Sequence, residues 1–105
     1  MTVASLDKKV EFLHGFSHKT RIEILYALLD GEKSVSQIMY SVDSSQSSIS
    51  QHLACLKGCG QIIGRQEGKY IYYRLRNEDI KRLLHNIDNV VQDLPADPHC
   101  QHHIV

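Results

Sequence analysis

Residues 44–60 read SSQSSISQHLACLKGCG, and this stretch decides the fold. Ser45 is well placed to cap a helix that runs to about Cys59, and Gly60 supplies its stop. At about 100° per residue, three apolar side chains fall on one side of this helix and predict a buried stripe: Ile49, Leu53 and Leu56. The polar side chains lie off that stripe, so the other face is left for another molecule.

A short helix before this stretch completes a helix-turn-helix. Ser34 and Gln37 have the spacing of a capping box, which predicts the start of that helix. A polar turn then leads to Ser45. Two short helices joined by a tight turn are typical of this DNA-binding motif.

Two more helices are predicted upstream. Ser5 can cap the first, and Ser17 can cap the second, which ends at Asp30-Gly31. Apolar residues recur at helical spacing in both helices: Leu6, Val10 and Leu13 in the first, and Ile22, Leu25, Leu28 and Leu29 in the second.

A β-hairpin and a final helix are predicted downstream. Residues 62–66, a turn at Glu67-Gly68 and the β-rich residues 69–75 form the hairpin, or wing. Asn77 starts the last helix, whose apolar residues form a long stripe: Ile80, Leu83, Leu84, Ile87, Val90, Val91 and Leu94. This stripe either packs on the core alone or also forms a dimer interface. We expect the dimer, because helix-turn-helix domains usually read two half-sites as symmetric pairs.

The expected fold class is α+β, mainly α: a winged helix-turn-helix of about five helices and a β-hairpin wing, assembled as a homodimer. Residues 1–94 form the DNA-binding and dimerisation domain, and residues 95–105 form a flexible tail that carries a metal ligand. With 105 residues, 42% of them hydrophobic, the chain has room for one small core.

Overall charge does not by itself indicate a nucleic-acid partner, because 12 Lys and Arg residues balance 12 Asp and Glu residues. Between Ser44 and Leu75, however, four basic residues are opposed only by Glu67: Lys57, Arg65, Lys69 and Arg74. The N-terminus has no apolar signal core, and no apolar run approaches the roughly 18 residues of a membrane span. Three cysteines without a secretory context indicate reduced thiols, so we expect a cytoplasmic protein with no membrane partner.

The polar face of residues 45–52 predicts double-stranded operator DNA as a partner. Short hydroxyls and glutamine amides can bond to phosphates and base edges. We assign seven residues of this helix to DNA: Ser45, Gln46, Ser47, Ser48, Ser50, Gln51 and His52. Two cations expected at the wing tip, Arg65 and Lys69, are assigned to the same interface. The alternative, a serine-rich face that is merely solvated, is disfavoured by the capped helix before it and the basic hairpin after it.

The cysteines suggest a metal site. Cys55 and Cys59 are spaced i, i+4, so they share one face of the helix, and this face is not the apolar stripe. Both thiols can therefore reach one metal ion. Cys100 in the tail is the third candidate ligand, from the same chain or a partner. Three thiolates favour soft ions, so Cd(II) and Pb(II) rank above Zn(II) and As(III). The alternative for the cysteines is a structural role as small buried side chains. The three histidines of the tail are either additional ligands or have no role: His99, His102 and His103.

Three segments together resemble the ArsR/SmtB family of repressors across nearly the whole chain: SHKTRIEILYALLDGE, SQSSISQHLACLK and GKYIYYRL. The segment HLACLKGCG followed by a late cysteine is most similar to the cadmium and lead sensors called CmtR. The resemblance implies a homodimer paired through its first and last helices, bound to its operator without metal and released when metal binds. It also implies that Cys100 comes from the partner subunit.

The predicted function is a metal-responsive transcriptional repressor that leaves DNA when Cd(II), Pb(II) or, less favoured, Zn(II) binds its thiolates. Two alternatives use the same residues. One is a repressor that senses oxidation by pairing Cys100 with Cys55 or Cys59, and the other is a small metal-buffering protein that never touches DNA. An enzyme is not expected, because no nucleophile-base pair, phosphate loop or site for a small organic substrate is recognisable.

Overall fold

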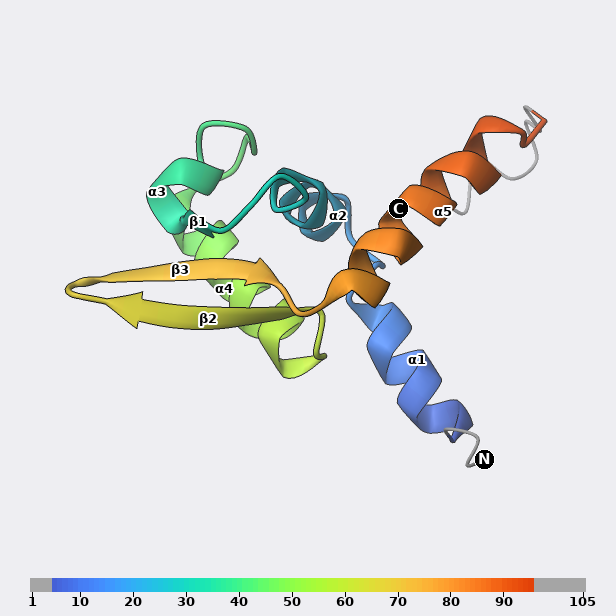
Figure 1. Cartoon of the computed structure of the whole chain (residues 1–105), viewed down its shortest axis with the longest axis horizontal. Helices are drawn as coiled ribbons and strands as arrows, with labels where there is room; N and C mark the ends of the chain where they lie inside the picture. The colour runs from blue at the N-terminus through green and yellow to red at the C-terminus, as the bar shows by residue number, and fades with distance from the viewer. Residues whose placement is uncertain (1–4, 96–105) are drawn as a thin grey trace.

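The computed structural model describes residues 5–95 of the chain. One antiparallel sheet has the strand order β1-β3-β2. The elements run in this order: α1 (Leu6–His14), α2 (Lys19–Ala27), β1 (Lys33–Ser34), α3 (Val35–Ile38), α4 (Gln46–Gly58), β2 (Ile62–Glu67), β3 (Tyr70–Leu75) and α5 (Glu78–Gln92). Figure 1 shows the β2–β3 hairpin projecting from one side of the molecule, and α1 and α5 extending from the opposite side.

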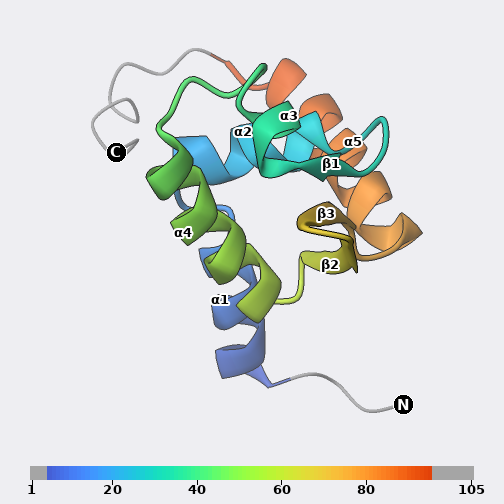
Figure 2. The same ribbon diagram turned by 90° about the vertical axis from the view of Figure 1, so that its left-hand side faces the viewer.

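The arrangement is a winged helix-turn-helix, as the sequence predicts. α3 and α4 form the helix-turn-helix, and the β2–β3 hairpin is the wing. In two orthogonal views, the C-terminal end of α4 lies beside α1, while the N-terminal end of α4 lies near α3 (Figures 1 and 2). The two ends of α4 therefore have different neighbours. None of the helices in residues 5–95 is long and apolar enough to cross a bilayer.

Four predicted helix starts are confirmed. The side chains of Ser5, Ser45 and Asn77 each accept a hydrogen bond from a backbone N–H in the first turn of α1, α4 and α5. Ser34 and Gln37 form the full capping box at α3, with both reciprocal hydrogen bonds present. These caps satisfy backbone donors that a helix leaves unpaired at its N-terminus, which fixes where the helix begins.

The predicted start of α2 is wrong by one residue. His18, not Ser17, is the N-cap, and its Nδ1 accepts a hydrogen bond of 3.1 Å from the Thr20 N–H. The Ser17 hydroxyl instead donates to the His14 carbonyl oxygen at the end of α1. An imidazole nitrogen can act as the capping acceptor because it lies at a distance from the backbone similar to that of an asparagine oxygen.

Two further boundaries differ from the sequence prediction. α2 ends at Ala27, before the predicted Asp30-Gly31, and the chain leaves it through further turns. Gly31 lies beyond these turns with a φ of 142°. The wing turn is at Gly68-Lys69, not Glu67-Gly68, because Glu67 still pairs with Tyr70. Gly68 takes the first turn position with a φ of 62°, a conformation that favours glycine there.

Strand β1 was not predicted. Lys33 pairs with Tyr73 and Ser34 pairs with Tyr72, so β1 adds a third strand to the wing. Ser34 is thus both a strand residue and the cap of α3. This double role makes the start of the helix-turn-helix continuous with the sheet.

The core lies between the helix-turn-helix, α2 and the base of the wing. Twelve buried apolar residues form it: Ile24, Leu25, Leu28, Ile38, Val42, Ile49, Leu53, Leu56, Ile62, Leu75, Ile80 and Leu84. The predicted stripe of α4 is confirmed, since all three of its members have no exposed surface. Burial of each such side chain stabilises the fold by about 1.5–3 kcal/mol.

The two terminal helices keep exposed apolar faces. α1 has no buried residue, and Leu6, Val10 and Leu13 are 75%, 59% and 59% exposed. In α5 only Ile80 and Leu84 are buried, while Val90 and Val91 are exposed. The long predicted stripe of α5 therefore exceeds what the core of one chain covers.

Candidate nucleic-acid interface and thiol site

The N-terminal half of α4 presents polar side chains to solvent. Ser48 is half-buried, and the Ser45 oxygen is already engaged, since it accepts a hydrogen bond of 3.1 Å from the Ser48 N–H. Five of the predicted DNA-contacting residues are exposed here: Ser45, Gln46, Ser47, Ser50 and Gln51. This end of the helix is the part that contacts base edges in helix-turn-helix proteins.

A cavity of about 390 Å³ separates this end of α4 from the wing. Gln46 and Ser50 line one side, and Lys69 and Tyr70 line the other. The Lys69 ammonium lies 5.5 Å from the centre of the Tyr70 ring. The geometry brings Lys69 and the polar face of α4 to one surface, as the sequence predicts.

Arg65 is not at the wing tip. It lies in β2 opposite Tyr72, and its guanidinium is 5.3 Å from the centre of that ring. It forms ion pairs with Glu32 and with Glu67, the latter at 2.8 Å. The hydrogen bond from Arg65 lowers the pKa of the Glu32 carboxyl. The charge of Arg65 is therefore largely balanced within the protein.

His52 faces α2. Its Nδ1 accepts a hydrogen bond of 3.2 Å from the Arg21 Nε, and its ring lies 4.5 Å from the His18 ring. Partial burial, with smaller effects from the charges of His18 and Arg21, lowers the pKa of His52. Its imidazole is thus neutral near pH 7 and joins α4 to α2.

Cys55 and Cys59 are brought together, as their spacing predicts. Both are reduced and half-buried, and the Cys59 N–H donates to the Cys55 carbonyl oxygen at 2.9 Å, which sets the two side chains one helical turn apart. Burial, the neighbouring Cys55 and, more weakly, Glu11 raise the pKa of the Cys59 thiol. Two adjacent thiols are a suitable pair for a soft cation, which stabilises both thiolates at once.

Cys59 opens onto a cavity of about 480 Å³ at the C-terminal end of α4. Glu11 and Phe12 of α1 and Ile80 of α5 line it as well. Within residues 5–95, no three His, Cys, Asp or Glu side chains are grouped closely enough to hold a metal ion. The predicted third ligand and the tail histidines lie outside the described residues: Cys100, His99, His102 and His103.

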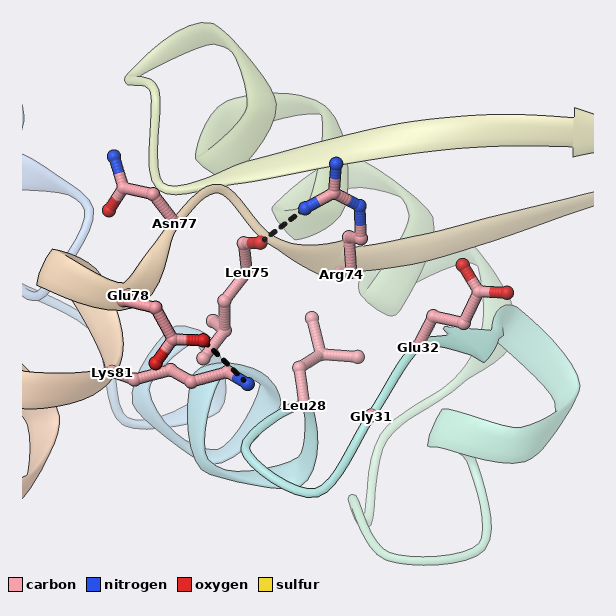
Figure 3. A pocket seen from close by; sticks show the side chains of 8 residues that line it. All are labelled: Leu28, Gly31, Glu32, Arg74, Leu75, Asn77, Glu78 and Lys81. Carbon is pink, nitrogen blue, oxygen red and sulfur yellow. Dashed lines mark hydrogen bonds and ion pairs between the residues drawn. The ribbon is translucent and has the colours of Figure 1, made fainter.

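A third cavity, of about 260 Å³, lies where α2, β3 and α5 meet (Figure 3). Its charged side chains already have partners: Glu78 pairs with Lys81 at 3.5 Å, and Arg74 donates to the Leu75 carbonyl oxygen. None of the predicted site residues lines this cavity.

Gln61, which follows α4, was not among the predicted site residues. Its side chain is completely buried and its Nε2 donates to the Phe12 carbonyl oxygen of α1. One feature of the sequence indicates that this residue is unusual. Gln61 stands directly before the apolar pair Ile62 and Ile63, at a position where an apolar residue would suit the core better.

The fold has a capped recognition helix, α4, whose polar face lies beside a basic wing, and two terminal helices, α1 and α5, with exposed apolar faces. These features define a DNA-binding transcriptional regulator of the winged helix-turn-helix class. Residues 18–63 match the arsR family of bacterial regulatory proteins. The chain is 36% identical over 81 residues to the HTH-type transcriptional regulator CmtR of Mycobacterium tuberculosis, covering 77% of this chain and 69% of that protein. The protein therefore belongs to the arsR family.

Two further relatives bear on metal and assembly. The chain is 41% identical over 69 residues to a cadmium resistance transcriptional regulatory protein CadC homolog of Staphylococcus aureus, covering 65% of this chain and 57% of that protein. A homodimeric winged helix-turn-helix DNA-binding domain from Mycobacterium bovis superposes with a TM-score of 0.80 at 27% identity, covering 91% of this chain and 94% of that domain.

Proposed function

We propose that the protein is a homodimeric repressor that binds operator DNA without metal and leaves it when a soft heavy-metal ion binds Cys55 and Cys59. The observation that carries this proposal is that one helix, α4, has both the exposed reading residues at its start and the thiol pair at its end. A ligand held by the thiols changes the position or mobility of the helix that reads DNA. The relatives are transcriptional regulators, which supports DNA over a metal-buffering role.

DNA recognition is assigned to the start of α4 and to the wing. We assign Gln51 and Ser48 to base edges in the major groove, and Lys69 to a phosphate. The cavity between wing and helix, which Lys69 lines, supports the assignment of Lys69. His52 and Arg65 have protein partners, so we assign them to positioning these contacts.

The dimer is proposed to form through α1 and α5. Both helices extend from the same side of the molecule and expose apolar residues that the core does not cover (Figure 1). A cavity lined by Lys8, Phe12 and Leu13 of α1 and by Leu83 of α5 continues this apolar surface. The homodimeric relative from M. bovis supports this assembly, which sets the spacing of two reading helices.

The inducing ion is proposed to be Cd(II) or Pb(II), with Zn(II) less favoured, because the donors at the site are sulfur. Cys55 and Cys59 would hold the ion, and Cys100, in the tail, would supply the third thiolate. The name of the cadmium resistance relative supports this assignment. Thiols must lose protons to bind, so affinity falls as the pH falls.

Titration of operator release tests the proposal. Fluorescence anisotropy with DNA from the upstream region would follow release by Cd(II), Pb(II), Zn(II) and As(III) under reducing conditions, and thiolate-to-metal absorption would follow occupancy. We expect occupancy to weaken operator binding by about 5- to 150-fold, the usual range of coupling between two sites. Unchanged operator affinity with the thiols occupied would contradict the proposal. Release by peroxide but not by metal would favour the redox alternative.

A further inference from the structure

Gln61 joins the end of α4 to two other elements. Its N–H donates to the Leu56 carbonyl oxygen at 3.0 Å, which continues the last turn of α4. Its carbonyl oxygen accepts from the Arg76 N–H at 2.9 Å, just before α5. Its side-chain Nε2 donates to the Phe12 carbonyl oxygen in α1. One residue therefore bonds to α4, to α1 and to the segment that leads into α5.

The contact with α1 is unusually close. A Cβ atom added to Gly15 would lie 2.5–2.8 Å from three atoms of the Gln61 amide, closer than real Cβ atoms approach other atoms. Gly15 has an ordinary helical φ of −61°, so its backbone conformation does not require glycine. What requires glycine here is the space taken by the Gln61 side chain.

Stability does not explain this glutamine. Gln61 has no exposed surface, and its Oε1 accepts no hydrogen bond from the described residues. Leaving such a buried acceptor unpaired costs about 1–3 kcal/mol. The Phe12 carbonyl oxygen already accepts from the Gly15 N–H at 3.2 Å, so it needs no second donor. An apolar side chain of the same size would remove the unpaired oxygen without leaving a new one.

Its position relative to the thiols suggests the role. Gln61 follows Cys59 by two residues, and α1 has an exposed apolar face at Leu6, Val10 and Leu13. We propose that Gln61 is a positioning residue that transmits ligand binding at Cys55 and Cys59 to α1, and through α1 to the spacing of the paired subunits. This role rests on the proposed function, and it explains why a buried, incompletely bonded amide stands between a reading helix and a terminal helix.

Gln61→Leu separates this role from a structural one. We expect its melting temperature to equal or exceed that of the wild type, and its thiol affinity for Cd(II) and its metal-free operator affinity to stay near wild-type values. The expected loss is in the coupling: Cd(II) should weaken operator binding by less than about fivefold, the lower end of the usual coupling range. Wild-type Cd(II)-driven release in Gln61→Leu, with normal folding, would overturn the proposal.

Gly15→Ala tests the same contact from the other side, should Gln61→Leu fold poorly. The new methyl group pushes the Gln61 amide away, so we expect weakened coupling here as well. Gly58→Ala is the matched control, since its Cβ would meet nothing within 4 Å. Equal coupling in Gly15→Ala and Gly58→Ala would count against the proposal.

Hydrogen exchange of the α1 amides on Cd(II) binding keeps the two proposals distinguishable. A change in α1 exchange in the wild type that disappears in Gln61→Leu supports the role of Gln61 even if the operator is not released, an outcome that would refute only the proposed function. An α1 response that persists in Gln61→Leu would overturn the role of Gln61, whatever happens to DNA.

Discussion

The two ends of α4 differ in how they are held. At the N-terminal end, Ser47, Ser50 and Gln51 are exposed. At the C-terminal end, Cys55 and Cys59 are half-buried and the following Gln61 bonds to α1. The helix has 13 residues, about 20 Å at 1.5 Å per residue. A short rigid helix can therefore contact DNA at one end and respond to a ligand at the other.

The largest effect is expected at the thiol end. Cys55→Ser or Cys59→Ser removes one of the two helix-bound donors, and we expect a loss of Cd(II) affinity of about a hundredfold or more, since loss of an outer-shell group alone can cost about 10- to 100-fold. Competition with a chelator, read by thiolate absorption, measures it. Metal-free operator affinity is the control and should not change.

The same series includes Cys100→Ser. We propose that the segment carrying Cys100 becomes ordered when the metal captures it, and the entropy lost in that step would offset part of the energy of the new bond. We therefore expect a smaller loss of Cd(II) affinity than in Cys55→Ser and a poor release of operator. Wild-type behaviour of Cys100→Ser in both measurements would remove the tail from the proposed site.

The next largest effect is expected at the N-terminal end of α4, where the proposed base contacts lie. Gln51→Ala should weaken operator binding by about 1–3 kcal/mol, the value of one lost base contact, and relax specificity at one base position. Ser48→Ala should act in the same direction. Anisotropy titrations against the operator and single-base variants would measure both, and Cd(II) stoichiometry should remain as in the wild type. Unchanged operator affinity in both variants would contradict the assigned face.

The wing cations should give a smaller and unequal effect. Lys69→Gln should weaken binding to all sequences alike and reduce the slope of log affinity against log salt by about one unit, as expected for one phosphate contact. Arg65→Gln should change that slope by less than about half a unit, because the Arg65 charge is balanced by Glu32 and Glu67. Equal changes in slope would place both cations on phosphates.

The smallest effect is expected at His52. Because its Nδ1 is bonded to Arg21, His52→Gln should change operator affinity at pH 7 by less than about 1 kcal/mol. The lowered pKa has a second consequence. As the pH falls through the ordinary histidine range, the unfolded chain takes up this proton before the folded chain does, so acid lowers stability. Thermal melts from pH 7 to pH 5 should show a smaller loss in His52→Gln.

Local patterns predicted much of this fold. Ser34, Ser45 and Asn77 act within three residues of themselves, so their caps can be read from the sequence. The stripe of α4 is equally local, because it depends only on the helical repeat. The cap of α2 was missed because Ser17 and His18 compete for the position, and their relative fit depends on where α1 ends.

The less successful predictions concern partners far apart in the chain. Arg65 meets Glu32 across 33 residues, and His52 meets Arg21 across 31. Gln61 bonds to Phe12 across 49 residues. No spacing of residues in the sequence predicts such contacts, because they depend on how β2 and α4 pack against the rest of the fold. The short strand β1 was hidden for a related reason, since its two residues pair only with β3.

The pairing of β1 with β3 has a consequence for the way the protein leaves DNA. Ser34 caps α3 and is also paired with Tyr72 in the sheet of the wing, so the start of the helix-turn-helix is joined directly to the wing. In a dimer, the two DNA-binding units must match the distance between the two half-sites of the operator, which is about 34–36 Å for one turn of DNA. We therefore expect the metal-bound protein to have a changed preference for that length, and operators with base pairs added or removed between the half-sites to regain part of the lost affinity.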